Sequence, residues 1–361
     1  MSALKHPVPT TPEVSRRMQS LTKRRLSAEE LDGLMREATG VGCRLEAELT
    51  DGWFNTAYRV RFDDGRAAVV KVAPAADAPV LRYERGIMGT EALMYRRLAS
   101  LADGRVPTPE LLYAGDDFLA VSVLEGTPWD KVADRLPAGT GSALRRELGA
   151  ITARLHTLVS EDGRFGYPAP ESGLSAPDWR TAFTLMVDAL LDDAAHWRSD
   201  LGVTAAEVRA LVAAGADALD EVTTPCLVHF DLWPGNIFVS VSDEDVEGDG
   251  DGDGDGDAGS DVRITGLIDH ERAFWGDPAA ELISLEFGGD VGPDSDLVAG
   301  YREAGGRLDF TPALRHRLAL YGLYLGLLLV AECGPRGYEG DRVTWSRGYL
   351  SERVAALRAL G

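Results

Sequence analysis

The sequence has little cysteine and no long apolar segment. Its three cysteines, Cys43, Cys226 and Cys333, are widely spaced among 361 residues, which excludes a disulfide framework and a cysteine-rich metal cluster. The longest apolar run, residues 318–331, is too short to span a bilayer and is better explained as a buried helix. The N-terminus lacks the apolar core of a signal peptide. These absences predict a cytoplasmic protein.

Basic residues are also few, and the charge is unevenly distributed. The chain has 37 Lys and Arg against 58 Asp and Glu, a net charge of −21. Ten of the acidic residues lie between residues 243 and 261, where Gly and Asp alternate over residues 248–257. Such a segment cannot bury apolar surface and repels itself, which predicts a disordered loop. The remaining acidic excess argues against nucleic acid and anionic membranes as partners and is compatible with a cationic ligand.

The composition is that of a globular protein with two lobes. Hydrophobic residues make up 45% and charged residues 26% of the chain, and 361 residues are many for one hydrophobic core. Residues 1–25 carry Pro, Thr and basic side chains and are interpreted as a loosely ordered, flexible arm. Ser27 and Glu30 then form a capping box that starts a helix, which Gly40 ends.

Strand-like segments follow this helix. They cover residues 43–50, 57–62, 67–73, 110–114 and 118–124. Between the second and third of these segments stands Asp-Asp-Gly-Arg, a strong hairpin signal that predicts an antiparallel sheet. After the last segment, Glu-Gly-Thr-Pro interrupts the chain and suits a hinge between two lobes.

A lysine lies inside one of these strands. Lys71 stands within the apolar run of residues 69–72, so its side chain is either paired or exposed on an edge strand. Glu91 opens a helical pattern over residues 91–98 and is the preferred partner of Lys71. Glu84 is the second candidate, because periodicity does not exclude it.

From about residue 140 the apolar pattern becomes helical. The predicted helices cover residues 140–156, 179–197, 204–221, 279–287, 311–332 and 343–360, with a Pro- and Gly-rich loop at 165–178. Asp188, Asp192 and Asp193 fall on or near one helical face, which is either a solvated face or a surface that binds the ammonium groups of a substrate. Glu332 and Glu339 are further candidates for lining an acceptor pocket.

Two β-type runs end in polar groups that suit phosphoryl transfer. One run contains His229 and Asp231, and Asn236 follows Asp231 after a Pro-Gly turn; the other run ends at Asp269. The turn places Asp231 and Asn236 on opposite sides, so that the first residue can receive a proton while the second binds a cation. One Asp for the attacking hydroxyl, with a separate Asn and Asp for Mg²⁺, is the arrangement that phosphoryl transfer needs.

The pattern His-x-Asp-x-x-x-x-Asn, followed by Ile-Asp-x-Glu, resembles the aminoglycoside phosphotransferase family of protein-kinase-like enzymes. The run from Asp231 to Asn236 is also similar to that of fructosamine kinases. The resemblance implies an α+β, bilobal protein-kinase-like fold. Residues 26–124 would form an N-lobe with an antiparallel sheet, and residues 125–361 a mainly helical C-lobe.

The resemblance also implies roles for individual residues. Asp231 would be the catalytic base, and Asn236 and Asp269 would hold Mg²⁺. ATP would be bound by Lys71 with its partner Glu91, by Asn55 and Thr56 in the turn over the phosphates, and by the backbone of Ser122, Val123 and Leu124 at the adenine. His229 would fix the catalytic loop. Asp277 resembles a second acidic position that braces this loop, and Glu281 stands where many family members have Asp.

The expected reaction is transfer of the γ-phosphoryl group of ATP to a hydroxyl. The short connection between Asp269 and Asp277 lacks the long segment that orders a peptide substrate, which favours a small acceptor. The leading interpretation is a polar, amine-bearing acceptor such as an aminoglycoside, with antibiotic resistance as the consequence. The alternatives are a fructosamine kinase-like or other metabolic kinase, and a nucleotide-binding regulator without turnover. The sequence leaves the oligomeric state open.

Overall fold

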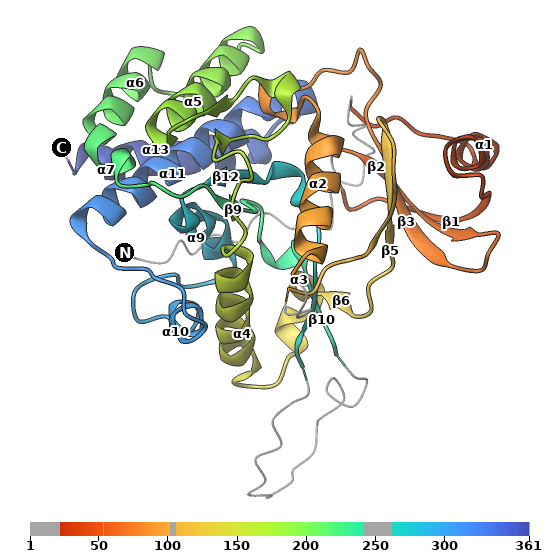
Figure 1. Ribbon diagram of the computed structural model, residues 1–361. Coiled ribbons are helices and arrows are strands. Elements are labelled where there is room, and N and C mark those ends of the chain that lie inside the picture. Colours follow the sequence, from red (N-terminus) through yellow and green to blue (C-terminus); the bar gives the residue numbers. More distant parts are fainter. Residues whose placement is uncertain (1–21, 53, 102–105, 242–261, 361) are drawn as a thin grey trace, which may run out of the picture.

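The computed structural model of the chain describes residues 22–52, 54–101, 106–241 and 262–360. Figure 1 shows a sheet with helical segments on both faces, beside a larger, mainly helical part. The fold is α+β, as expected. The N-lobe contains the helices α1 (Ala28–Thr39) and α2 (Ile87–Ala99) and the strands β1 (Cys43–Leu49), β2 (Thr56–Phe62), β3 (Ala67–Val72), β4 (Leu111–Ala114) and β5 (Phe118–Ser122).

The five strands form an antiparallel sheet in the order β1-β2-β3-β5-β4. Successive side chains of a strand point to opposite faces. Ala68, Val70 and Val72 of β3 therefore pack with α1 in one buried cluster, whereas Lys71 points to the opposite face, toward Glu91 on α2. The position of Lys71 within an apolar strand follows from this alternation.

The first helix begins and ends as the sequence predicts. Ser27 and Glu30 form the capping box of α1, and Gly40 ends it with φ 76°. The preceding residues differ from the expected loose arm. Thr22 is buried and donates a hydrogen bond to the Phe54 carbonyl at 3.1 Å, and Arg24 forms an ion pair with Asp117 at 2.6 Å. Residues 22–25 are thus held against the sheet, and residues 1–21 lie outside the described part.

The C-lobe is built mainly from helices. Its longer helices are α4 (Thr140–Leu155), α5 (Trp179–His196), α6 (Ala205–Ala214), α7 (Ala216–Asp220), α9 (Glu281–Leu285), α10 (Asp296–Glu303), α11 (Pro312–Ala331) and α13 (Asp341–Arg358). The single helix expected over residues 204–221 is two helices, because Gly215 separates α6 from α7 where the chain packs against His316 and Leu320. The Gly/Asp loop expected over residues 243–261 lies outside the described residues.

The most apolar helix lies in the core of the C-lobe. The segment Pro312–Arg336 is long and apolar enough to cross a membrane, but 83% of its most apolar window is buried inside the protein. It packs against α5 and α13. Residues 318–331 therefore form the buried helix that the sequence predicts.

Two small sheets in the C-lobe bring distant loops together. One sheet has the order β11-β10-β6 and the other β8-β7-β12-β9, where the short strands are β6 (Thr127–Pro128), β7 (Phe165–Gly166) and β8 (Ser175–Ala176). The strands that matter for the site are β9 (Cys226–Val228), β10 (Ile237–Val239), β11 (Ile264–Leu267) and β12 (Phe274–Gly276). Because β9 pairs with β12 and β10 pairs with β11, the loop from β9 to β10 and the loop from β11 to β12 cross between the same two sheets. Residues 229–236 and 268–273 consequently lie side by side.

Candidate active site

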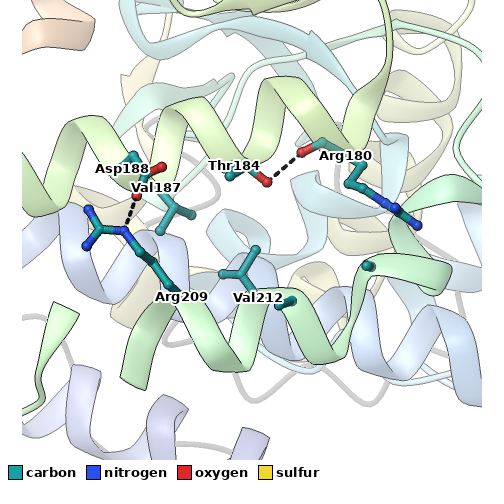
Figure 2. Close-up of a pocket in the computed structure, with 8 residues that line it drawn as sticks. Arg180, Thr184, Val187, Asp188, Arg209 and Val212 are labelled. Atoms are coloured by element: carbon teal, nitrogen blue, oxygen red, sulfur yellow. Dashed lines mark hydrogen bonds and ion pairs between the residues drawn. The ribbon is translucent and has the colours of Figure 1, made fainter. Parts of the chain in front are cut away.

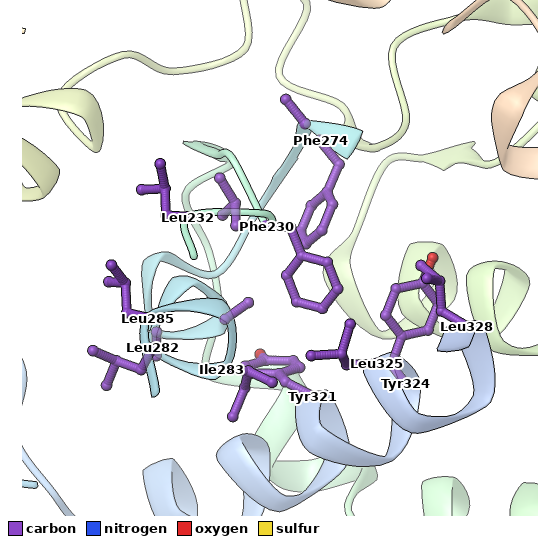
Figure 3. Close-up of a cluster of buried hydrophobic side chains, with 14 of the residues drawn as sticks. Phe230, Leu232, Phe274, Leu282, Ile283, Leu285, Tyr321, Tyr324, Leu325 and Leu328 are labelled. Atoms are coloured by element: carbon purple, nitrogen blue, oxygen red, sulfur yellow. The ribbon is translucent and has the colours of Figure 1, made fainter. Parts of the chain in front are cut away.

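A buried carboxylate and aromatic packing hold the loop that carries Asp231 in place. Glu281, fully buried at the start of α9, accepts hydrogen bonds from the backbone amides of His229 at 2.6 Å and Phe230 at 2.9 Å. Phe230 has φ 61°, a conformation that costs about 1–3 kcal/mol for a bulky residue. Its ring packs against Phe274 and Tyr324 (Figure 3). The backbone next to Asp231 is therefore rigid.

The bracing carboxylate is Glu281 and not Asp277, which corrects the expectation for Asp277. Among the described residues, Asp277 contacts Arg317 at 2.8 Å and the Tyr321 hydroxyl at 2.8 Å, and it caps the short helical turn that follows it. Sequence spacing did not distinguish the two acids. The sequence feature that could have indicated Glu281 is its charge, which stands inside the apolar stretch of residues 278–285.

Both carboxylate oxygens of Asp231 contact a neighbouring side chain. Oδ2 accepts a hydrogen bond from Asn236 Nδ2 at 3.2 Å, and Oδ1 is 3.0 Å from Arg272 Nη1. Burial raises the pKa of Asp231 to about 7, although the Arg272 charge opposes this shift. A carboxylate whose pKa lies near neutrality is suited to receive a proton from a hydroxyl. Arg272 was not predicted from the sequence. The feature that could have indicated its role is a single Arg three residues after Asp269.

The pKa of Asp231 predicts the pH dependence of turnover. The group acts as a base only when ionised, so kcat/KM should rise about tenfold between pH 6 and pH 8 as Asp231 loses its proton. A pH profile of initial rates with an accepted substrate measures this rise. A profile that is flat across this range would contradict the assignment of a base with this pKa.

Lys71 joins the two lobes. Its Nζ lies 2.6 Å from Glu91 Oε1 and 2.6 Å from Asp269 Oδ1. Burial alone would lower the pKa of Lys71, but the charges of Asp269 and Glu91 raise it well above its usual value, so the amine stays charged. Glu84, the other candidate partner, is buried elsewhere and pairs with Arg336.

Oxygen donors for a divalent cation gather where the two loops meet. The Asn236 carbonyl accepts a hydrogen bond from the Ile268 amide at 3.1 Å, which brings Asn236 next to Asp269. Carboxylate oxygens of Glu91, Asp269 and Glu271 lie within 4.8 Å of one another, and Glu91 Oε2 is buried without a hydrogen-bond partner among the described residues. Hard cations such as Mg²⁺ prefer oxygen ligands of this kind. The residues present therefore fit a divalent cation.

The turn between β1 and β2 approaches this cluster. Asn55 is buried and donates a hydrogen bond to Glu271 Oε2 at 2.8 Å. Within the described part of the chain, Asn55 Oδ1 and the buried Thr56 hydroxyl have no hydrogen-bond partner. Burial, followed by the charge of Asp269, raises the pKa of Glu271 well above its usual value. The turn predicted to lie over the phosphates thus presents polar groups beside Lys71 and Asp269.

The predicted adenine-binding segment lies beside β11, the strand that precedes Asp269. Ser122 is the last residue of β5. Its amide donates a hydrogen bond to the Glu110 carbonyl, and its hydroxyl accepts one from the Glu110 amide, both at 2.9 Å. Leu124 packs onto Gly266 of β11 so closely that a Cβ at that glycine would lie 2.2 Å from a Leu124 methyl carbon. The contact of Val123 and its neighbours with adenine remains a prediction.

Two histidine rings contact each other inside the site. His229 Nε2 lies 2.9 Å from the Ile268 carbonyl, and its Nδ1 accepts a hydrogen bond from the Asp231 amide at 3.3 Å. His270 was not predicted, and its ring centroid lies 4.4 Å from that of His229 and 5.0 Å from that of Tyr95 on α2. Neither His270 nitrogen has a hydrogen-bond partner among the described residues. Burial lowers the pKa of His270 well below its usual value, so its ring is neutral.

His270→Phe should stabilise the protein. The substitution removes two buried polar atoms that lack partners and keeps the ring contacts with His229 and Tyr95, so the free energy of unfolding should rise by about 1 kcal/mol. Urea-induced unfolding measures this change. The matched control is His229→Phe, which removes the hydrogen bond to Ile268 and should destabilise by about 1–3 kcal/mol. Equal destabilisation by both variants would contradict the prediction.

The acidic residues considered for an amine-bearing acceptor do not form one surface. Asp188 forms an ion pair with Arg209 at 2.7 Å, in a groove of about 350 Å³ between α5 and α6 (Figure 2). Asp193 accepts a hydrogen bond from the Arg82 amide at 2.8 Å, and Asp192 is exposed. Of these acidic residues, only Glu332 is connected with Asp231. Its Oε1 lies 2.7 Å from Arg272 Nη2, and Arg272 also contacts Asp231. For Glu339, which is exposed, no role in the site emerges.

The comparison with known families shows to which family the chain belongs. Residues 46–248 match the APH phosphotransferase enzyme family, and the match covers more than half of the chain. The chain belongs to the phosphotransferase enzyme family. The matched residues extend from β1 through the loop with Asp231 and Asn236, while Asp269 and Arg272 follow the match.

One curated protein and two solved structures resemble the chain to different degrees. A Staphylococcus aureus (strain NCTC 8325 / PS 47) protein assigned as a ketoamine kinase is 26% identical over 207 residues, which are 52% of this chain and 62% of that relative, less than two thirds of its length. A Thermobifida fusca YX-ER1 protein assigned as a fructosamine-3-kinase has a TM-score of 0.61 at 24% identity, covering 92% of this chain and 99% of that one. APH(2'')-IIa, in a ternary complex with streptomycin and ATP, has a TM-score of 0.55 at 15% identity, covering 92% and 99%. The two solved structures establish a shared fold.

Proposed function

We propose that this protein transfers the γ-phosphoryl group of ATP to a hydroxyl of a small molecule. The observation that carries the proposal is the convergence of three charged groups from separate parts of the chain. Lys71 contacts Asp269 at 2.6 Å. Asp231 lies on the neighbouring loop: its Oδ1 is 3.0 Å from Nη1 of Arg272, three residues after Asp269, and the Ile268 amide donates a hydrogen bond to the Asn236 carbonyl at 3.1 Å. A cation for phosphates, a metal ligand and a base are the parts that phosphoryl transfer requires.

In the proposed reaction the acceptor oxygen attacks the γ-phosphorus, and the acceptor proton passes to Asp231. The bond between the γ-phosphorus and the β–γ bridging oxygen breaks, and ADP leaves with that oxygen. Asn236 and Asp269 would hold Mg²⁺, which would neutralise charge on the nucleotide phosphates. Lys71, held by Glu91, binds the α- and β-phosphates. The remaining contacts to ATP would come from Asn55, Thr56 and the backbone of Ser122, Val123 and Leu124.

A sugar-modified amine, or ketoamine, is the acceptor class that we favour. The ketoamine kinase and the fructosamine-3-kinase described above support it. The charge around Asp231 supports it as well, because Glu332, which Arg272 connects with Asp231, already accepts hydrogen bonds from Tyr83 and Arg272. An acceptor with several ammonium groups needs free carboxylates, whereas a ketoamine carries few positive charges.

A polycationic aminoglycoside is the second candidate acceptor, and the streptomycin complex of APH(2'')-IIa is the observation that favours it. The third candidate function is that of a nucleotide-binding regulator. It would bind ATP with Mg²⁺ and release no ADP in response to any acceptor.

A coupled assay distinguishes these possibilities. Calorimetry with ATP and MgCl₂ first establishes nucleotide binding. ADP release is then followed with fructosyl-lysine, kanamycin, streptomycin, choline and homoserine as separate acceptors. Fructosyl-lysine should give a kcat/KM at least about tenfold above the other compounds, because one recognised group is typically worth a factor of this size. ATP binding without acceptor-dependent ADP release would overturn the proposed function.

A further inference from the structure

A buried carboxylate from the C-terminal part of the chain contacts the arginine that pairs with Asp231. Glu332, which follows α11, is 3% exposed. Its Oε1 accepts hydrogen bonds from the Tyr83 hydroxyl at 2.7 Å and from Arg272 Nη2 at 2.7 Å. A buried carboxylate with two donors on one oxygen is a strongly held acceptor.

Arg272 connects this carboxylate with Asp231. Its Nη1 lies 3.0 Å from Asp231 Oδ1, while its Nη2 contacts Glu332. One guanidinium therefore spans two carboxylates with two different nitrogens. If Glu332 were absent, Asp231 would be the remaining carboxylate partner among the described contacts, and a guanidinium prefers to bind a single carboxylate with both nitrogens. Such a bidentate pair would occupy the oxygen positions of Asp231 that an acceptor hydroxyl needs.

The same oxygen of Glu332 is tied to the N-lobe. Tyr83 lies in the short helical turn Arg82–Glu84, directly before the helix that carries Glu91. The adjacent backbone amide of Arg82 donates a hydrogen bond to Asp193 on α5 at 2.8 Å. The segment before α2 is therefore attached to the C-lobe at the carboxylate that also holds Arg272.

We propose that Glu332 is a positioning residue for phosphoryl transfer. It holds Arg272 away from a bidentate contact with Asp231, and thereby keeps one edge of the base open for the acceptor hydroxyl. This inference rests on the function proposed above.

Glu332→Gln in the full-length chain tests the inference, because the amide keeps the shape and removes the charge. With fructosyl-lysine as the acceptor, kcat should fall about 10²-fold, the loss expected when a reacting group is misplaced by about 1 Å. The KM for ATP and the affinity for ADP should stay within about twofold. A kcat within threefold of the unmodified protein would overturn the proposal.

The chain offers a matched control with the same three residue types. Glu286 accepts a hydrogen bond from the Tyr349 hydroxyl at 2.9 Å and pairs with Arg353, outside the contacts of Asp231. Glu286→Gln should cost comparable stability in urea unfolding and leave kcat unchanged. If both variants lose stability and kcat in parallel, Glu332 is structural only and the inference fails.

A crystal structure of Glu332→Gln decides the point without turnover. The Arg272 guanidinium should move to contact both oxygens of Asp231. An Arg272 that keeps its single contact would overturn the inference. If the unmodified protein phosphorylates none of the acceptors, the proposed function fails, and the structure of the variant still tests the placement of Arg272.

Discussion

Asp231→Asn is expected to lower kcat by about 10²–10⁴-fold, which is the usual contribution of a general base. The amide cannot take a proton from the acceptor hydroxyl. It keeps the size of the side chain, and Arg272 retains Glu332 as its ionic partner at 2.7 Å. The fold should therefore survive, and the loss should appear in turnover.

Nucleotide binding separates this loss from a general defect. Asp231 contacts Asn236 and Arg272, whereas Lys71 is held by Glu91 and Asp269. Calorimetry with ADP and MgCl₂ should give an affinity for Asp231→Asn within about threefold of the unmodified protein. Initial rates with the accepted substrate measure kcat in parallel.

The matched control is Asp188→Asn. Asp188 is also paired with an arginine, Arg209 at 2.7 Å, but it lies in the groove between α5 and α6 (Figure 2). This variant should keep full turnover. Near-complete activity of Asp231→Asn, or equal losses in the two variants, would show that Asp231 is not the base.

The parts of the site that follow from local sequence rules were predictable. The alternation along β3 predicts that Lys71 opposes the apolar face. The helical spacing after residue 90 makes Glu91 the preferred partner, and the structure decides against Glu84, which pairs with Arg336. The polar residues at the ends of β9 and β11 meet because those strands pair with neighbours in two common sheets. For Lys71 and Glu91 a periodicity of two or 3.6 residues carries the information.

The parts that depend on distant packing were not predictable. Arg272 contacts Asp231 and Glu332, which are separated from it by 41 and 60 positions. The choice of Glu281 over Asp277 depends on which carboxylate faces the amides of His229 and Phe230 after the chain has folded. His270 looks polar in the sequence but is buried against Tyr95. No local pattern reports such contacts, because they are set by tertiary structure.

Asp269→Asn is expected to remove the effect of Mg²⁺ on nucleotide binding. A carboxylate that ligates a hard cation contributes both an oxygen and a charge, and the amide keeps only the oxygen. Asn is the suitable replacement because Asp269 has φ 68°, a backbone conformation that Asn tolerates and Ala does not. Lys71 retains Glu91 at 2.6 Å, so its position should change little.

The measurement is the ratio of ADP affinities with MgCl₂ and with EDTA. In the unmodified protein MgCl₂ should strengthen binding by about 10²-fold or more, because even a residue that only orients a metal ligand contributes about 10–100-fold to metal affinity. In Asp269→Asn this ratio should fall to about one, and the affinity in EDTA should stay near that of the unmodified protein. Asp231→Asn provides the contrast, since it should retain the full response to MgCl₂. A response to MgCl₂ that is undiminished in Asp269→Asn would mean that the cation is held by Glu91 and Glu271, the other carboxylates within 4.8 Å, and would remove Asp269 from the metal site.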